Sequence, residues 1–396
     1  MATAVEGYIA GPTPTQAVLL SSHTRQGDSV ILTLTVICAD SLVHTEMGDV
    51  RKYLVFVFVW GMSLATSLMV VPWLLWLRWK VGKEVFSVKP RPTPPPALKD
   101  SKWGSLTHTY MDLKTQGVKL HYVEAGDHNN PLMVFLHGFP ECWFSWRHQL
   151  KYFSENYWVV AVDLRGYGDS DKPSGTSQYK KDLLVADLKH FIQGLGKEQC
   201  TLVAHDWGAA LAWHLVALYP HMFSAHISCN GPHPNSFEKR IKSSLSQLAK
   251  SWYIFLFQMP WLPELLIRTQ DLKAFEDMLR GNKKECVITD DEIEVYKYYF
   301  SQKGALTPPI NYYRNIDFGS TGKPLPRVLV PTLIIWGTGD VALDKELAVM
   351  GVDECESAEV KYVEGANHWV PQDEPSAFNT LAEQYLNSPL AGQKVL

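Results

Sequence analysis

The sequence predicts an α/β fold in which a mostly parallel sheet of eight strands is covered by helices, with an inserted helical cap and an apolar N-terminal helix. Three observations lead to this prediction. Short apolar or β-branched runs alternate with helical patterns beyond residue 103, the β pattern stops between about residues 231 and 327, and residues 53–77 are apolar and uncharged. Alternating strands and helices favour a parallel sheet, because each parallel crossover usually contains a helix.

Eight segments beyond residue 103 have the pattern of strands. Several are continuous runs of apolar or β-branched residues, which is typical of strands buried on both faces of a sheet. Only a short polar turn separates the first two, so we expect these two to be antiparallel. Helical patterns lie between the later strands, for example at 183–195 and 209–219. The expected strands are 108–113, 119–124, 132–136, 158–162, 200–204, 225–229, 332–336 and 359–363.

These patterns divide the chain into six parts. An aromatic-rich helical cap interrupts an α/β core, and an apolar anchor with a basic, Pro-rich linker precedes that core. The expected parts are an N-terminal tail at 1–52, a transmembrane anchor at 53–77, the linker at 78–102, the first part of the core at 103–230, the cap at 231–327 and the second part of the core at 328–396.

The anchor is the strongest hydrophobic feature of the chain. Residues 53–77 are about as many as a helix needs to cross a bilayer. A buried core helix is the alternative, but a core helix of this length rarely lacks every charge. Tryptophans near the ends are typical of membrane interfaces; they are Trp60, Trp73, Trp76 and Trp79.

Basic residues predict how the anchor is oriented. Five follow it within residues 78–91, whereas only Arg51 and Lys52 lie close before it, and positive residues favour the cytoplasmic side. We therefore expect a single-pass membrane protein, at the endoplasmic reticulum, with its catalytic part in the cytosol. The Pro-rich stretch 90–96 is expected to be a stiff spacer that holds this part off the membrane.

The composition argues against nucleic-acid binding and against a metal site built from cysteines. The formal net charge is −4 and the pI is near 6.4, so the chain lacks the basic footprint of a nucleic-acid-binding protein. The six cysteines are scattered without CxxC or metal-finger spacing, so we expect reduced thiols rather than a metal site. No Asn-x-Ser/Thr acceptor occurs. Reduced thiols and missing acceptors both favour a cytosolic catalytic part.

The principal catalytic candidate is Asp206. An apolar strand runs into Ala204-His205-Asp206-Trp207-Gly208 and then into a helix. Small residues two positions either side of the central residue are typical of the strand-to-helix elbow that carries the nucleophile of α/β-hydrolases. A carboxylate at this tip is ionised at neutral pH and needs no base to become nucleophilic. It suits attack on an sp3 carbon, although Asp at such a junction can also be a plain N-cap.

Two further residues follow the last two expected strands. Asp340 comes directly after 332–336, and His368 follows 359–363 in Glu364-Gly-Ala-Asn-His. The order of nucleophile, acid and histidine is the one that this fold uses, and ligands bind at the carboxyl ends of such strands. We expect His368 to activate water and Asp340 to orient it. Asp344 and a position near Asn230 are competing sites for the acid.

The loop after the third strand completes the predicted site. His137-Gly-Phe-Pro-Glu occupies the place from which this fold supplies one backbone N–H of the oxyanion hole, while the residue after the nucleophile supplies the other. These donors are expected to be the backbone groups of Phe139 and Trp207.

Four motifs together resemble the epoxide hydrolases of the α/β-hydrolase superfamily. They are HGFPE at 137–141, DLRGYGDSDKP at 163–173, HDWG at 205–208 and GANHW at 365–369. The resemblance covers roughly residues 103–388, and the anchor and linker make the chain look most like the membrane-bound animal epoxide hydrolases three and four. HDWG alone also occurs in haloalkane dehalogenases.

The resemblance implies a site and a reaction. Two cap tyrosines, Tyr313 and Tyr253, would protonate the epoxide oxygen while Asp206 forms an alkyl ester that water then hydrolyses. Tyr312 is the competing neighbour of Tyr313. No metal or cofactor is required, and the partners are a small apolar epoxide, water and the membrane through residues 53–77. The aromatic cap suggests lipid epoxides, for example fatty-acid epoxides.

Two other functions are compatible with the motifs. A dehalogenase would share Asp206, His368 and Trp207 but would not need two phenols to protonate a leaving group, so turnover of styrene oxide against a chloroalkane would separate the two. A non-catalytic receptor on a hydrolase fold is the second alternative. Such proteins tend to lose triad residues, which are all present here.

Overall fold

Eight strands form a single sheet in the computed structural model, which describes residues 27–99, 101–281, 288–318 and 323–389. The spatial order is β1-β2-β4-β3-β5-β6-β7-β8. All eight expected strands are confirmed, with ends within two residues of those expected. Their bounds are β1 Thr107–Leu113, β2 Val118–Ala125, β3 Leu132–Leu136, β4 Trp158–Val162, β5 Cys200–His205, β6 Phe223–Cys229, β7 Thr332–Gly337 and β8 Ala358–Val363.

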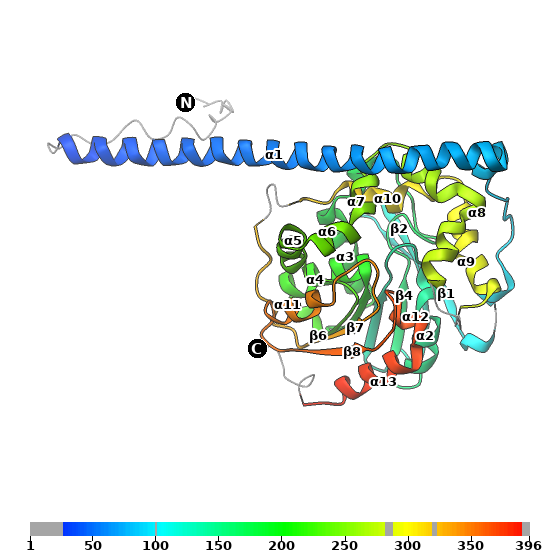
Figure 1. The fold of residues 1–396 in the computed structure, drawn as a ribbon. Coiled ribbons are helices and arrows are strands. Elements are labelled where there is room, and N and C mark those ends of the chain that lie inside the picture. The colour runs from blue at the N-terminus through cyan, green and yellow to red at the C-terminus, as the bar shows by residue number, and fades with distance from the viewer. Residues whose placement is uncertain (1–26, 100, 282–287, 319–322, 390–396) are drawn as a thin grey trace, which may run out of the picture. The chain divides into compact units, whose positions relative to one another are not determined.

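The sheet is antiparallel at one edge and parallel in the rest. β2 pairs antiparallel with both β1 and β4, and the remaining pairs are parallel. Helices lie on both sides of the sheet (Figure 1), which explains why β3, β4, β5 and β7 consist wholly of buried residues. This is the α/β-hydrolase fold expected from the sequence.

Two hydrophobic cores fill the space between the sheet and its helices. Successive residues of a strand point to opposite faces, so Val134 of β3 belongs to one core and Phe135 to the other. The first core includes α3 Lys181–Gly194, α4 Asp206–Leu218 and α11 Glu346–Val352. The second includes α2 Arg147–Phe153 and α13 Pro375–Leu386.

The chain between β6 and β7 forms the cap. Its described residues contain helices and no strand, as the loss of the β pattern predicts. The cap helices are α5 Pro234–Ser243, α6 Leu245–Lys250, α7 Trp252–Leu256, α8 Leu262–Arg280, α9 Asp290–Ser301 and α10 Thr307–Arg314. A non-helical kink at residues 269–272 divides α8, and three of its residues have positive φ.

The N-terminal helix is longer than the anchor expected from the sequence. α1 runs from Gly27 to Val81, whereas we expected a tail up to residue 52 and a helix from 53. Residues 27–52 are mixed in character and gave no helical signal, but extending an existing helix costs far less than starting one. The part Lys52–Val81 is long and apolar enough to cross a membrane, with mean hydropathy 2.2. Residues 1–26 lie outside the described part.

The linker after α1 is docked on the cap, whereas we expected a stiff spacer that holds the catalytic part off the membrane. Arg91 donates to both oxygens of Asp271 at 2.9 Å, and its Nε donates to Glu294 at 2.8 Å. The Trp103 indole is buried and donates to Ala97 O at 3.1 Å. Short 3₁₀ turns at Lys83–Phe86, Pro96–Lys99 and Ser101–Trp103 replace an extended chain.

Candidate active site

Asp206 stands at a tight turn between β5 and α4. Its φ is +49°, a left-handed conformation that is unusual for a residue with a side chain. A Cβ on Gly208 would lie 2.4 Å from Leu136 O, and one on Gly138 would lie 2.4 Å from Asp206 Cβ. Only glycine fits at both positions, because the backbone and the carboxylate approach too closely for a side chain. The glycine of the elbow motif and the glycine of HGFPE therefore have a direct steric cause.

The two oxygens of the Asp206 carboxylate have different partners. Oδ1 accepts a hydrogen bond from the backbone N–H of Phe139 at 2.7 Å. Oδ2 lies 3.5 Å from Nε2 of His368. Trp207, the next residue, begins the first turn of α4, where backbone N–H groups have no partner within the helix. One oxygen is thus held by a backbone donor and the other faces the histidine.

Asp340 and His368 form a buried hydrogen-bonded pair. His368 Nδ1 lies 2.8 Å from Asp340 Oδ2, and the Asn230 side chain donates to the same oxygen at 2.6 Å. The other oxygen of Asp340 accepts the backbone N–H groups of residues 342 and 343. These donors lock the carboxylate, which in turn fixes the imidazole with Nε2 toward Asp206.

The charges around His368 favour its protonated form. Burial lowers the pKa of His368, but the carboxylates of Asp340 and Asp206 outweigh burial and raise this pKa well above its ordinary value. The same interaction with His368 keeps the pKa of Asp340 below its usual value despite complete burial. The three groups form a charged unit inside an apolar region.

The competing acid positions have other partners. Asp344 binds the Arg240 guanidinium at 2.9 Å and the Ser246 hydroxyl at 2.9 Å. Asn230 lies beside Asp340 and supports it. The geometry therefore brings Asp340 to His368, and Asp344 instead joins the cap to the core.

The cap brings two phenols close to Asp206. Tyr313 of α10 lies with its ring 5.0 Å from the Trp207 ring and 5.8 Å from the ring of Tyr253, which belongs to α7. Burial raises the pKa of both hydroxyls, and the negative charge of Asp206 raises both further. Tyr312 points elsewhere, because its hydroxyl donates to Arg165 O at 2.7 Å.

Aromatic rings line the space beside the phenols. The Phe139 ring makes edge contacts with four other rings at centroid distances of 5.5–6.4 Å, from Phe257, Phe275, Phe300 and Tyr313. All five side chains are buried. An apolar substrate would be the favoured occupant of such surroundings.

A second buried network behind the site was not predicted. His205 Nδ1 lies 2.7 Å from Glu141 Oε2, and His205 Nε2 lies 2.9 Å from the backbone oxygen of His368. Glu141 also accepts from the backbone of Gly138 at 2.7 Å and from Gln372 at 2.9 Å. The network joins the loop that contains Phe139 to the loop that contains His368. Glu141 ends the motif HGFPE and His205 begins the motif HDWG, so both lie next to predicted site residues in the sequence. This proximity is the sequence signal that could have indicated the network.

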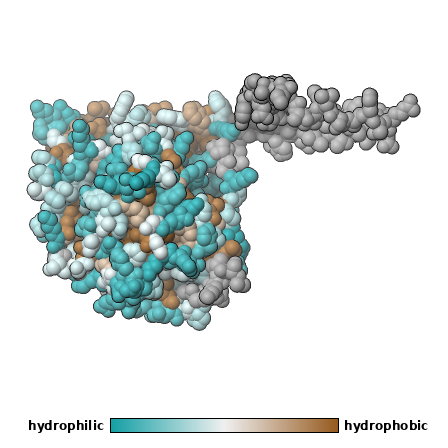
Figure 2. Space-filling view, turned by 180° about the vertical axis from the view of Figure 1, so that it is seen from behind, coloured by the Kyte–Doolittle hydropathy of each residue, from teal (hydrophilic) through white to brown (hydrophobic). Residues whose placement is uncertain are grey.

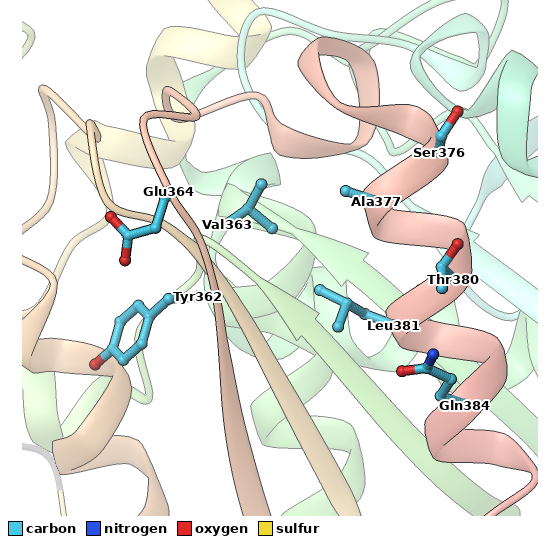
Figure 3. A pocket seen from close by; sticks show the side chains of 8 residues that line it. All are labelled: Tyr362, Val363, Glu364, Ser376, Ala377, Thr380, Leu381 and Gln384. Atoms are coloured by element: carbon cyan, nitrogen blue, oxygen red, sulfur yellow. The ribbon is translucent and has the colours of Figure 1, made fainter.

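Two other features do not form part of this site. His121, Asp163 and Asp169 are close enough to hold a cation. However, Asp163 already accepts His121 Nδ1 at 2.7 Å and the backbone N–H of Asp169 at 3.0 Å, so it orders the 165–170 loop. An open groove of about 530 Å³ lies between β8 and α13 (Figure 3). Its lining contains none of the catalytic candidates.

Comparison with known proteins places the chain in a family. A family model described as the alpha/beta hydrolase fold matches residues 131–375. Epoxide hydrolase 3 of Xenopus tropicalis is 41% identical over 338 residues, which cover 84% of this chain and 91% of the relative. Epoxide hydrolase 4 of Homo sapiens is 40% identical over 322 residues, covering 79% and 88% respectively.

The chain belongs to the epoxide hydrolase family of the α/β-hydrolase fold. The resemblance drawn from its motifs is confirmed. The crystal structure of Bacillus megaterium epoxide hydrolase in complex with an inhibitor superposes with a TM-score of 0.64 at 32% identity, covering 71% of this chain and 100% of that one. This epoxide hydrolase is therefore an enzyme, and its helix Lys52–Val81 adds a segment that could span a membrane.

Proposed function

We propose that this epoxide hydrolase forms a covalent ester of Asp206. In the first step, Asp206 Oδ2 bonds to an epoxide carbon, the bond from that carbon to the ring oxygen breaks, and this oxygen takes a proton from Tyr313 or Tyr253. The assignment of Oδ2 as the attacking atom rests on the surroundings of the Asp206 carboxylate. Oδ1 is occupied by Phe139 N–H at 2.7 Å, whereas Oδ2 lies 3.5 Å from His368 and is available for attack.

The second step hydrolyses this ester. His368 takes a proton from water, and the water oxygen bonds to the carboxyl carbon of Asp206. The former Oδ1 then carries the developing negative charge between the backbone N–H groups of Phe139 and Trp207, each contributing about 3 kcal/mol. Base catalysis by His368 contributes roughly 10²- to 10⁴-fold. The bond from the carboxyl carbon to the alkyl oxygen breaks, and this oxygen takes the second proton of the water from the new carboxyl group. A vicinal diol leaves and the Asp206 carboxylate is restored.

The charge of Asp206 determines when His368 acts as a base. In the resting site Asp340 and Asp206 hold the pKa of His368 high, so its imidazole is protonated. Ester formation removes the charge of Asp206, and the phenolate left by the first step accepts the histidine proton. Neutral His368 is then ready to activate water. The proton that it takes from water restores the starting state, so protons balance over the cycle.

The substrate is proposed to be an apolar epoxide dissolved in lipid, such as a fatty-acid epoxide. The ring of buried aromatic side chains around Phe139 favours an apolar molecule. A helix suited to cross a membrane is joined to the core by a short linker that binds the cap, which keeps the enzyme where such epoxides accumulate. We place the anchor in the endoplasmic reticulum. The catalytic part is proposed to face the cytosol, since Arg78 and Lys80 lie in the last turn of α1 and Lys83 follows it.

A trapped intermediate tests the proposed reaction. The variant His368→Gln should accumulate one covalently bound substrate per chain after exposure to styrene oxide, with the adduct on Asp206 in peptide mass spectra. Wild-type protein should release the diol, and Asp206→Asn should form no adduct. Wild-type protein should not turn over a chloroalkane. An adduct on another residue, or a His368→Gln variant that releases diol at the wild-type rate, would rule the proposal out.

Protease protection tests the proposed orientation. In sealed microsomes, added protease should cleave the catalytic part without detergent, because that part faces the outside. Cleavage that requires detergent would place it in the lumen instead.

A further inference from the structure

One face at the start of α8 exposes large side chains on the surface of the cap. Trp261 and Leu265 are 81% and 36% exposed, and Arg268 is exposed as well. They follow each other at helical spacing of four and three residues, so they share one side of the helix. Pro263 and Ile267 on the other side are buried. Trp261, Leu265 and Arg268 together are called the α8 face below.

Trp261 is presented in an unusual way. Of the ten tryptophans that follow α1, only Trp252 and Trp261 are exposed. Trp261 has φ +57°, a left-handed conformation that is unfavourable for a large side chain. At 81% exposure its indole gains little from packing within the chain. On the face drawn in Figure 2, hydrophobic residues form only small groups among hydrophilic ones. An exposed, strained tryptophan therefore indicates a binding partner.

The linker fixes how far the α8 face is from the apolar helix. Arg268 Nε donates to Phe86 O at 3.3 Å, and α1 ends at Val81. Five residues of chain span at most roughly 17 Å, and Trp261 lies about 10 Å along α8 from Arg268. Arg91 and Asp271 fasten the next part of the linker to the kink of α8. The α8 face thus lies near the end of the helix whatever tilt that helix adopts.

We propose that the α8 face docks into the interfacial layer of the same bilayer that α1 enters. This inference rests on the proposed membrane anchor. Tryptophan favours the headgroup region, because its ring is apolar and its N–H is polar. Leu265 adds apolar area, and the Arg268 guanidinium suits the phosphate of a headgroup. The bilayer is already close to the α8 face, because the membrane anchor holds the protein at the bilayer surface.

Docking at this position would bring lipid beside the catalytic cap. The loop that carries Trp261 is bound by Arg314, which donates to Phe257 O at 3.0 Å and Met259 O at 2.7 Å. Gln258 in the same loop donates to Tyr313 O at 2.9 Å. The membrane-facing loop is therefore attached to the helix of a proposed catalytic phenol. An epoxide dissolved in lipid would then reach the buried aromatic residues around Phe139 and Tyr313 without crossing water.

Photolabelling from the lipid phase tests the docking directly. The full chain is reconstituted into phosphatidylcholine and phosphatidylserine vesicles that contain a diazirine lipid with its probe near the headgroup, and adducts are mapped by peptide. Adducts are expected on α1 and on residues 257–268, and not on α11, where Val349 is 55% exposed. Labelling of α1 without α8 overturns this inference. Absence of labelling from α1 overturns the membrane anchor as well. Cross-links from α8 to a second chain, with no lipid adducts, would indicate a dimer and also overturn it.

Kinetics in the same vesicles separate docking from catalysis. Trp261→Ser with Leu265→Ser should raise KM for a bilayer-dissolved epoxide about fivefold or more, because apolar area no longer enters the interface. Its kcat and KM for a small water-soluble epoxide should stay at wild-type values, as should every constant of the control Val349→Ser. An unchanged KM for the lipid epoxide overturns the inference. If both activities of the double variant disappear, misfolding is indicated and the wild-type photolabelling decides.

Discussion

Replacing Asp340 with asparagine should slow one step of the reaction and leave the other nearly intact. Asp340 is linked to His368 Nδ1 at 2.8 Å, and its charge raises the pKa of the imidazole. Asparagine keeps the shape but removes the charge that orients and supports the base. Ester hydrolysis should therefore lose much of the base contribution, which is roughly 10²- to 10⁴-fold, or about 3–5 kcal/mol.

Ester formation should change far less, because the nucleophile keeps its backbone donor and both phenols. The assay is rapid quenching after mixing enzyme with excess styrene oxide, followed by intact-protein mass spectrometry. Asp340→Asn should show a burst of ester approaching one per chain, followed by slow turnover. The matched control is Asp344→Asn, another buried carboxylate after β7, which binds Arg240 and does not contact the histidine. Its kcat should be near that of the wild type.

The result that would refute this reasoning is equal slowing of both steps. If Asp340→Asn formed the ester as slowly as it hydrolysed it, with no burst, the carboxylate would be needed for the attack itself. A burst in Asp344→Asn would instead identify Asp344 as the supporting acid.

Two further predictions concern the phenols and acid stability. Tyr313→Phe or Tyr253→Phe should slow ester formation about tenfold or more, because each removes an acid that protonates the epoxide oxygen. Hydrolysis of a preformed ester should stay unchanged. Stopped-flow quenching of tryptophan fluorescence measures the rate of ester formation, and the control Tyr312→Phe should keep the wild-type rate. Burial raises the pKa of Glu141, but its buried histidine partner outweighs burial and lowers this pKa to about 2. Since the folded pKa lies below the unfolded value near 4.5, the stabilisation is present above pH 4.5 and is lost as pH falls toward 2. Between pH 4.5 and 2, the free energy of unfolding measured in urea should thus fall by about 3 kcal/mol more in the wild type than in Glu141→Gln. Equal dependence of this free energy on pH in the two proteins would contradict the pairing of Glu141 with His205.

Local patterns were sufficient to predict the strands and the cap. Buried strands such as Leu132–Leu136 contain only apolar residues, so a strand that is buried on both faces can be recognised from its sequence alone. The steric demands of the elbow also appear locally, because Gly138 and Gly208 have no room for a Cβ. Asp340 and His368 could be placed because strand ends in a parallel sheet meet at one edge.

Contacts between distant parts of the chain could not be read in the same way. Arg91 reaches Asp271 across 180 positions, and no local period indicates that pair. The sequence therefore predicted a stiff spacer and gave no sign that its arginine binds the cap. The choice between Tyr312 and Tyr313 depends on a rotation of about 100° around α10, which sequence spacing leaves open. The structure directs the Tyr312 hydroxyl to Arg165 O, whereas the Tyr313 ring lies beside Phe139 and Tyr253.

The most direct test of the central claim is a single turnover in ¹⁸O-labelled water with enzyme in excess over epoxide. A covalent ester of Asp206 predicts that the label enters the carboxylate of this residue, and that the first diol released contains none. Label found in the diol after one turnover, with Asp206 unlabelled, would show that water attacks the epoxide directly and would contradict the nucleophilic role of Asp206.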